Sequence, residues 1–234
     1  SSASTMKAME YERYVASGGI PTRDEFHDWF NGLVWLAYPR AKSQINCLHV
    51  READASILRF QAESAWPRSG NQRSALRDAL TLWDESGAVL LTSSSTVQEA
   101  LREHDWQHLF VQLRSEWGVS ILPYCFGHGL LDALRVPHKG LCAKVKVVHV
   151  DAAILNQFVN PVSNSFNNAG HSANPLSPTL DEIFLSVINQ LKSPRDLSPL
   201  PVMGVPGWFE ANTVPGFYAD ESVFRKKPTR VGPG

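Results

Sequence analysis

Cysteine is scarce in this sequence, and the few cysteines present are widely spaced. Cys47, Cys125 and Cys142 are the only three among 234 residues, and no two of them form a CxxC pair. This spacing contains neither a zinc knuckle nor an even-numbered disulfide framework. We therefore expect three reduced thiols buried as small hydrophobic side chains, because free cysteine is among the residue types most often found inside proteins.

The sequence also lacks an excess of charge and a long apolar run. Lys and Arg number 22 against 23 Asp and Glu, which gives a net charge of −1 and no excess to attract nucleic acid or anionic lipid. The longest apolar run, residues 33–38, falls far short of the roughly 20 residues that cross a bilayer. Residues 1–5 lack the basic-then-apolar pattern of a secretory signal. We expect a soluble, cytoplasmic protein with neither nucleic acid nor membrane as its partner.

Hydrophobic residues make up 43% of the chain, which is enough to form a sizeable core. Apolar residues at helical spacing predict helices over about residues 22–38, 40–60, 95–102, 106–117, 124–136 and 179–191. Capping boxes at Thr22 to Glu25 and at Thr179 to Glu182 mark the start of the first and last of these. Five apolar residues of the first helix are expected to face the core: Phe26, Trp29, Phe30, Leu33 and Val34.

Strands are predicted by two other patterns. The apolar runs 79–83 and 88–92 flank a turn at 84–87 and predict a β-hairpin. The alternating residues 141–150 predict a third strand.

Two segments resist regular structure. Residues 160–178 are rich in Asn, Ser, Pro and Gly and predict a mobile loop. Prolines recur throughout residues 193–234, which predicts an extended segment anchored by its aromatic side chains. Taken together, the patterns predict an α+β fold: a mainly helical single domain with a core over about residues 20–192. A small antiparallel three-stranded sheet completes it, and the extended Pro-rich C-terminal segment, residues 193–234, wraps the core.

Polar residues cluster on the helices at helical spacing. His27, Asp28 and Asn31 lie opposite the apolar stripe of the first helix, with His27 and Asn31 at i, i+4. Three residues repeat this spacing on the second helix: Lys42, Asn46 and His49. If the two helices pack antiparallel, both polar faces border one cleft. The alternative is that each is an ordinary solvated helix face.

Other polar residues offer further ligands. His128 and Asp132 stand at i, i+4, so an imidazole and a carboxylate face one site, or His128 is simply a satisfied core histidine. Asp84 and Glu85 open the predicted turn, where acids are common, and they also suit a divalent ion. Arg40 and Arg77 carry guanidinium groups that clamp carboxylate or phosphate, or form structural ion pairs.

Several longer motifs resemble a bacterial family known as domain of unknown function 3025. They are His-Asp-x-Phe-Asn at 27–31, Pro-Arg-x-Lys at 39–42 with Asn46, the nine residues 77–85, Phe-Gly-His at 126–128, residues 200–208, residues 217–220, and Phe-Arg at 224–225. The resemblance covers nearly the whole chain and implies one architectural unit, but no activity. Asp132 departs from the pattern, which has Glu at that position.

We therefore expect a hydrolase that acts on a small anionic substrate. Four residues are its expected catalytic groups, either around a divalent metal or as general acids and bases: His27, Asp28, His128 and Asp132. The candidate metal ligands are His27, Asp28, His128 and Asp84. The candidate substrate-binding residues are Asn31, Arg40, Lys42, Asn46 and Arg77. The alternative is a non-catalytic domain that binds a small ligand or a protein. Motifs for zincins, EF-hands, P-loops, Rossmann folds and serine hydrolases are absent.

Overall fold

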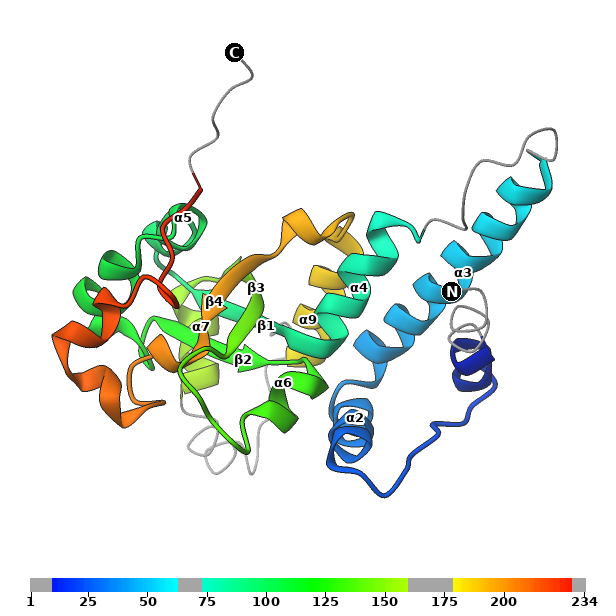
Figure 1. The fold of residues 1–234 in the computed structure, drawn as a ribbon, viewed down its shortest axis with the longest axis horizontal. Helices are drawn as coiled ribbons and strands as arrows, with labels where there is room; N and C mark the ends of the chain where they lie inside the picture. The colour runs from blue at the N-terminus through cyan, green and yellow to red at the C-terminus, as the bar shows by residue number, and fades with distance from the viewer. Residues whose placement is uncertain (1–9, 63–72, 160–178, 229–234) are drawn as a thin grey trace, which may run out of the picture. The chain divides into compact units, whose positions relative to one another are not determined.

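Helices and one sheet make up the described part of the chain, which is residues 10–62, 73–159 and 179–228 of a computed structural model (Figure 1). The fold is α+β, as predicted. Two compact units are present. Unit 1 contains the described residues of Ser1–Ser86, Phe126–Asp132 and Pro178–Leu197, and unit 2 those of Gly87–Cys125, Ala133–Ser177 and Ser198–Gly234. None of the described helices combines the length and apolar character needed to cross a membrane.

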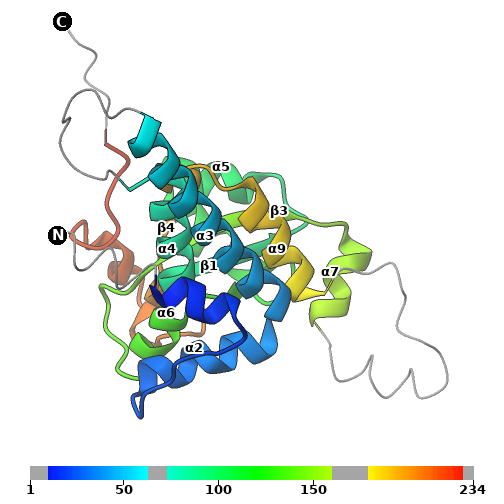
Figure 2. The ribbon, with the colours of Figure 1, turned by 90° about the vertical axis from the view of Figure 1, so that its right-hand side faces the viewer.

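Unit 1 is helical. It contains a helical segment at residues 10–16, then α2 (Phe26–Ala37), α3 (Pro39–Ala62), α4 (Ala75–Ser86), most of α6 (His128–Ala133), α9 (Leu180–Gln190) and the short 3-10 helix η3 (Pro194–Asp196). α3 packs against both α4 and α9, and the three helices run side by side in the two views (Figures 1 and 2). The second and last predicted helices are thereby confirmed as α3 and α9.

Aromatic side chains form the core of unit 1. Trp83 of α4, Phe126 and Phe184 of α9 are fully buried. The rings of Trp83 and Phe126 stack with centroids 6.0 Å apart, and Phe126 lies 4.9 Å from Phe184. Tyr38 meets Phe184 edge-on at 4.8 Å. These contacts fix α4 and the start of α6 relative to α9, because large buried rings tolerate little rearrangement.

One of the two predicted capping boxes is confirmed. The Thr179 hydroxyl accepts a hydrogen bond from the Glu182 amide at 3.2 Å, and the Glu182 carboxylate accepts one from the Thr179 amide at 3.0 Å. The predicted box at Thr22 is wrong, because α2 begins four residues later and the Thr22 hydroxyl donates to the Ile20 carbonyl instead.

The predicted β-hairpin at residues 79–92 is wrong in its first half. Residues 79–83 belong to α4, which buries Ala79, Leu80 and Trp83 on one face. A run of five mostly apolar residues fits a buried helix face as well as a strand, so its periodicity alone does not decide between them. The predicted turn residues, Asp84 and Glu85, are instead in the last turn of that helix.

Unit 2 is built on a mixed four-stranded sheet, so the prediction of three antiparallel strands is corrected. The strands are β1 (Gly87–Thr92), β2 (Ile121–Cys125), β3 (Cys142–His149) and β4 (Ser198–Pro201), in the order β2-β1-β3-β4. β1 pairs antiparallel with β2 and parallel with β3, and β3 pairs antiparallel with β4. β2 and β4 both contain proline, which obscured their sequence signal.

Short helices surround this sheet. They are α5 (Thr96–Glu103), a π-helix η1 (His108–Gln112), η2 (Arg114–Glu116), α7 (Ala152–Val159), η4 (Val202–Gly204), η5 (Glu210–Thr213) and η6 (Pro215–Ala219). The continuous helix predicted over 106–117 is therefore broken into η1 and η2. The predicted loop at 160–178 lies outside the described residues.

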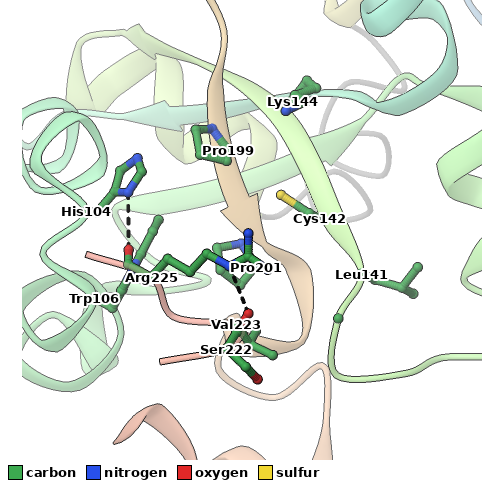
Figure 3. Close-up of a pocket in the computed structure, with 11 residues that line it drawn as sticks. His104, Trp106, Leu141, Cys142, Lys144, Pro199, Pro201, Ser222, Val223 and Arg225 are labelled. Atoms are coloured by element: carbon green, nitrogen blue, oxygen red, sulfur yellow. Dashed lines mark hydrogen bonds between the residues drawn. The ribbon is translucent and has the colours of Figure 1, made fainter. Parts of the chain in front are cut away.

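The described part of the C-terminal segment is not uniformly extended, since the four 3-10 helices η3, η4, η5 and η6 interrupt it. Its aromatic residues do act as anchors in unit 2: Tyr218 stacks on Phe110 with centroids 5.6 Å apart, and Phe224 meets the same ring edge-on at 6.0 Å. Trp208, by contrast, is exposed. A pocket opens beside β3 and β4 between this segment and the end of α5 (Figure 3).

Candidate functional site

Helix α2 turns its polar side inward. Phe26, Trp29 and Leu33, which the sequence predicts to be core residues, are exposed, whereas Asn31 and Val34 are buried. The prediction is confirmed for Val34 but wrong for Phe26, Trp29 and Leu33, because it assumes an apolar interior. The interior that α2 faces contains charged side chains of α3 and α4, and a polar helix face matches such surroundings.

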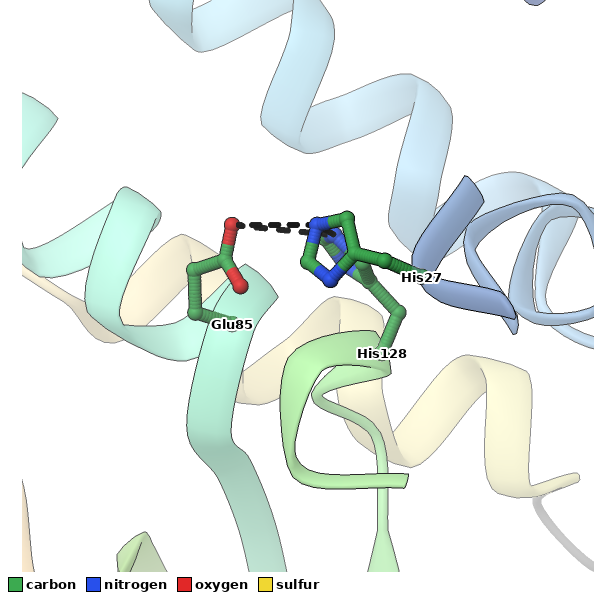
Figure 4. A group of neighbouring side chains, drawn as sticks. All are labelled: His27, Glu85 and His128. Atoms are coloured by element: carbon green, nitrogen blue, oxygen red, sulfur yellow. Dashed lines mark hydrogen bonds and ion pairs between the residues drawn. The ribbon is translucent and has the colours of Figure 1, made fainter. Parts of the chain in front are cut away.

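Two histidines from distant parts of the sequence meet in unit 1. The Nε2 atoms of His27, on α2, and His128, the first residue of α6, lie 3.2 Å apart. Their ring centroids are separated by 4.6 Å with the planes tilted by 59°. Figure 4 shows both rings beside the carboxylate of Glu85. Both imidazoles therefore direct their Nε2 atoms to the same point.

Glu85 supplies a carboxylate at that point. Its Oε1 atom lies 3.6 Å from Nε2 of His128 and 4.0 Å from Nε2 of His27. The three potential ligand atoms all lie within 4.8 Å of one another, close enough that they could hold a metal ion together. The side chains of His27 and Glu85 are 40% and 46% exposed, whereas that of His128 is only 6% exposed.

Two glycines allow this approach. A β-carbon on Gly127 would lie 2.5 Å from the amide nitrogen of Ser86 and 2.6 Å from the carbonyl carbon of Glu85. A β-carbon on Gly129 would collide with the Glu85 side chain. Only glycine therefore lets α6 begin directly against the last turn of α4.

A chain of buried polar contacts continues behind His128. Among the described residues its Nδ1 atom has no hydrogen-bond partner, and it lies 3.7 Å from Oδ2 of Asp84. The other oxygen of Asp84 accepts a 2.5 Å bond from Nζ of Lys42, whose side chain is 4% exposed. Lys42 also donates to Asn31 at 2.8 Å, and Asn31 donates to the Tyr11 hydroxyl at 3.2 Å. The ammonium group thus holds Asp84 behind the imidazole.

Burial shifts the pKa values of several groups in unit 1. It lowers the pKa of His128, with Lys42 lowering it further, so the neutral imidazole that can bind a metal is favoured. It also lowers the pKa of His49 to about 4. Burial raises the pKa of Glu12, whose carboxylate accepts a 2.6 Å bond from Asn46. This region of unit 1 is therefore an unusually polar interior.

Other residues predicted for the site have partners elsewhere in unit 1. The Asp28 carboxylate accepts hydrogen bonds from the amide and guanidinium of Arg23, which lower its pKa. Arg40 pairs with Glu182 at 2.7 Å. Asp132 is half-buried and is not among the three groups that could hold a metal.

The buried guanidinium of Arg77 has an Nε atom without a hydrogen-bond partner among the described residues. Burial is the main cause that lowers its pKa. Arg77 lies on α4. The charge of Glu12 raises the pKa of Arg77, and the charge of Arg77 lowers the pKa of His49, so Arg77 interacts with these two residues rather than with His27 and His128.

Sequence reasoning undervalued Glu85 and missed Tyr11 and Glu12. Residues 79–83 resemble a strand, and this pattern predicts that Glu85 lies in a turn. Had the region been interpreted as a helix, two adjacent acids in its last turn would have stood out, since carboxylates are unfavourable at the negative end of a helix. Tyr11 and Glu12 precede the first predicted element, and nothing in their spacing distinguishes them.

Comparison with known proteins adds a family but no activity. A family model described as "Protein of unknown function (DUF3025)" matches residues 1–228, a range that includes both units and every site residue named above. No curated protein and no solved structure gives a significant match. The motif resemblance seen in the sequence is thereby confirmed, and the chain belongs to the DUF3025 family.

Proposed function

We propose that unit 1 binds a divalent metal ion between His27, Glu85 and His128 and uses it to hydrolyse a small anionic substrate. The convergence of these three ligand atoms is the observation that carries the proposal. Metal–nitrogen bonds of about 2.0–2.1 Å at a tetrahedral ion place neighbouring ligand atoms about 3.3 Å apart. The 3.2 Å between the two Nε2 atoms is close to that value.

The electrostatics of α4 favour a cation at this position. Asp84 and Glu85 both lie in its last turn, which contains no basic residue. The carbonyl end of a helix is itself partially negative, so two carboxylates there repel the helix dipole and each other. Lys42 compensates Asp84. A divalent ion bound at Glu85 would compensate the second carboxylate.

The exposure of the ligands supports catalysis rather than a purely structural role. Structural zinc sites are closed by four protein ligands, whereas catalytic sites have three and keep one position for water or substrate. Here two of the three ligands are 40% and 46% exposed. Metal coordination lowers the pKa of bound water to about 7 and so supplies a nucleophile at neutral pH.

Asp84 would act through His128. A metal-bound histidine usually donates its second nitrogen to a carboxylate, which fixes the ring and its tautomer. Asp84 stands on that side of the ring, 3.7 Å from Nδ1, and a small rotation would bring it to hydrogen-bond distance. Lys42 and Asn31 hold this carboxylate in place.

The preference for an anionic substrate rests on the charge of the site. Two neutral imidazoles, one carboxylate and a divalent ion sum to about +1. Lys42 and Arg40 are paired with Asp84 and Glu182. The metal, rather than these two side chains, would then attract and polarise a phosphate or carboxylate ester.

A second candidate is a metal-free acid–base pair. The 3.2 Å separation of the two Nε2 atoms is also a hydrogen-bond distance, so one imidazole can donate a proton to the other. This mechanism requires no divalent ion, and chelation therefore separates it from the metal mechanism.

The experiment is a hydrolysis assay on the full chain with 4-nitrophenyl phosphate, bis(4-nitrophenyl) phosphate and 4-nitrophenyl acetate. The assay follows chelator treatment and then addition of Zn²⁺ or Mn²⁺. We expect activity on at least one phosphate ester that chelation abolishes and metal restores. Glu85→Gln should remove it, whereas Asp78→Asn on the same helix should not, because Asp78 pairs with Arg73. Activity that survives chelation would favour the acid–base pair, and no hydrolysis of any ester would contradict both.

A further inference from the structure

Unit 2 contains a pocket that no part of the proposed metal site uses. Its volume is about 430 Å³, within the range of roughly 300–1,000 Å³ typical of small-molecule sites. β3 and β4 form one side, the end of α5 a second, and the C-terminal segment around Arg225 a third (Figure 3). All the lining residues belong to unit 2.

The charge of the pocket is of one sign. Lys144 and Arg225 line it together with His104, and no Asp or Glu does. Within the described residues neither Lys144 nor Arg225 forms an ion pair, whereas Arg102, Lys139, Lys226 and Lys227 of unit 2 do. The Arg225 guanidinium makes a 3.0 Å bond from Nε to the Ser222 carbonyl, which orients it and leaves its terminal nitrogens for another acceptor.

Most of the remaining lining is apolar. Trp106, Leu141 and Val223 contribute ring and aliphatic surface. On the sheet, Cys142 faces Pro201 and Lys144 faces Pro199 in the register of β3 and β4. A ligand that fills this pocket therefore needs an apolar body as well as a negative group.

The walls are held together by hydrogen bonds. The Arg225 carbonyl accepts a 2.8 Å bond from the indole nitrogen of Trp106 and is 3.2 Å from Nδ1 of His104. Because a carbonyl only accepts, Nδ1 of His104 must carry a proton. The two rings also stack with centroids 5.0 Å apart. Such a preformed site loses little freedom when a ligand binds.

Cys142 also lines the pocket. It is exposed, contrary to the sequence expectation of buried thiols, and so is Cys47 in unit 1. Although Cys142 as a whole is exposed, its sulfur is surrounded by protein atoms, and this desolvation raises the pKa of the Cys142 thiol, whereas Lys144 and Arg225 both act to lower it. Both cations line the same pocket as this thiol.

We propose that this pocket binds a small organic anion: a carboxylate or phosphate-type group, held by Lys144 and Arg225, on an apolar body that packs against Trp106 and Leu141. The site is independent of the metal site proposed above, since it shares no residue with it. Its ligand chemistry is set by two cations that form no ion pair within the described part of the chain and that line a partly apolar cavity.

Calorimetric titration of the full chain with phenylphosphonate, benzoate and neutral benzamide tests this proposal. Chelator-treated protein keeps the metal site out of the measurement. We expect one site per chain for at least one of the two anions and weaker or no binding of benzamide. Lys144→Gln and Arg225→Gln should each lower the affinity for the anion by about tenfold or more, the effect of losing one charged hydrogen bond. Lys226→Gln is the matched control, because Lys226 is adjacent, pairs with Glu221 and does not line the pocket.

A second measurement needs no variant. Alkylation by iodoacetamide, followed by peptide mass spectrometry, should slow at Cys142 when the bound anion is present, while Cys47 serves as the internal reference. Equal affinity for benzamide, an equal effect of Lys226→Gln, or no protection of Cys142 would each overturn the proposal. Absence of binding by both anions would do so as well.

Discussion

His27 and His128 direct their Nε2 atoms to points 3.2 Å apart although 101 positions separate them in the sequence. α2 carries one ring and the start of α6 carries the other. Glu85, at the end of α4, completes the group. Three helices thus each contribute one candidate ligand atom, and if the group binds a metal, small changes in helix packing should alter metal binding more than overall stability.

Gly127→Ala should test this dependence on packing. The added β-carbon would press on the backbone of residues 85 and 86, which cannot rotate away as a side chain can. We expect a loss of about 1–3 kcal/mol in the free energy of unfolding, typical of overpacking, and weaker metal binding. Urea denaturation and a metal titration measure the two effects. Stability and affinity equal to those of the wild type would contradict the close approach.

Gly32→Ala is the matched control for that substitution. Gly32 lies within α2, and a β-carbon there would meet no atom within 4 Å. Alanine in a helix interior is favoured over glycine by about 0.5–1 kcal/mol. We expect the free energy of unfolding to rise by that amount with unchanged metal affinity.

Asp84→Asn should weaken the metal site without removing a ligand. The carboxylate faces Nδ1 of His128 and would orient the ring. Loss of such a partner typically lowers metal affinity by about 10–100-fold. A competition titration against a chelating dye measures this change. An affinity within about twofold of the wild type would show that Asp84 does not act through His128.

The pair of Lys42 and Asp84 should show strong coupling in a double-mutant cycle. Lys42→Met leaves a partly buried carboxylate without its cation, and breaking a buried pair typically costs about 3–5 kcal/mol. Because Asp84 is more exposed than Lys42, we expect the lower end of that range. Adding Asp84→Asn to Lys42→Met should recover part of the loss. Additive single effects, measured by urea denaturation, would contradict the coupling.

His49 should make stability fall in mild acid. Its pKa is about 4 in the folded chain, below the ordinary value of 6.5, so the unfolded chain takes up the proton first as the pH falls. The contribution is complete above pH 6.5 and is lost between 6.5 and 4. At pH 5 the loss is roughly 2 kcal/mol.

His49→Leu separates this effect from other titrations. Urea denaturation of metal-free protein at pH 7 and pH 5 should show a smaller acid-dependent loss in the variant than in the wild type. Since other groups titrate alike in both proteins, the difference between the two losses reports on His49. Equal losses would mean that burial of His49 does not depress its pKa.

The apolar pattern predicted α3 and α9 well because both follow simple rules. α9 has its apolar residues at helical spacing and begins with the capping box of Thr179 and Glu182. α2 shows the opposite case. Phe26, Trp29 and Leu33 of its apolar face are exposed, whereas Asn31 of its polar face is buried, because the interior that it meets is itself polar. An amphipathic pattern shows that the two faces of a helix differ in polarity, but it does not show which face is buried.

For the candidate metal site, helical spacing singles out His27 and His128 but not Glu85, the third member of the group. The predicted hairpin places Glu85 in a turn, although it lies in the last turn of a helix. The pattern favours Asp132 instead, because i, i+4 spacing places it on the same helix face as His128. Contacts between separate helices determine the actual group, and no local pattern encodes them. The glycines at 127 and 129 were the local sign of close packing at this point.

The most direct test of the metal site is a Zn²⁺ titration of the full chain in competition with a chelating dye. We predict one tight site per chain, weakened by at least about a hundredfold in His27→Ala and in His128→Ala, since each loses one of three ligands. His138→Ala, which alters an exposed histidine of unit 2, should retain the wild-type affinity. Wild-type zinc affinity in both His27→Ala and His128→Ala would contradict the account.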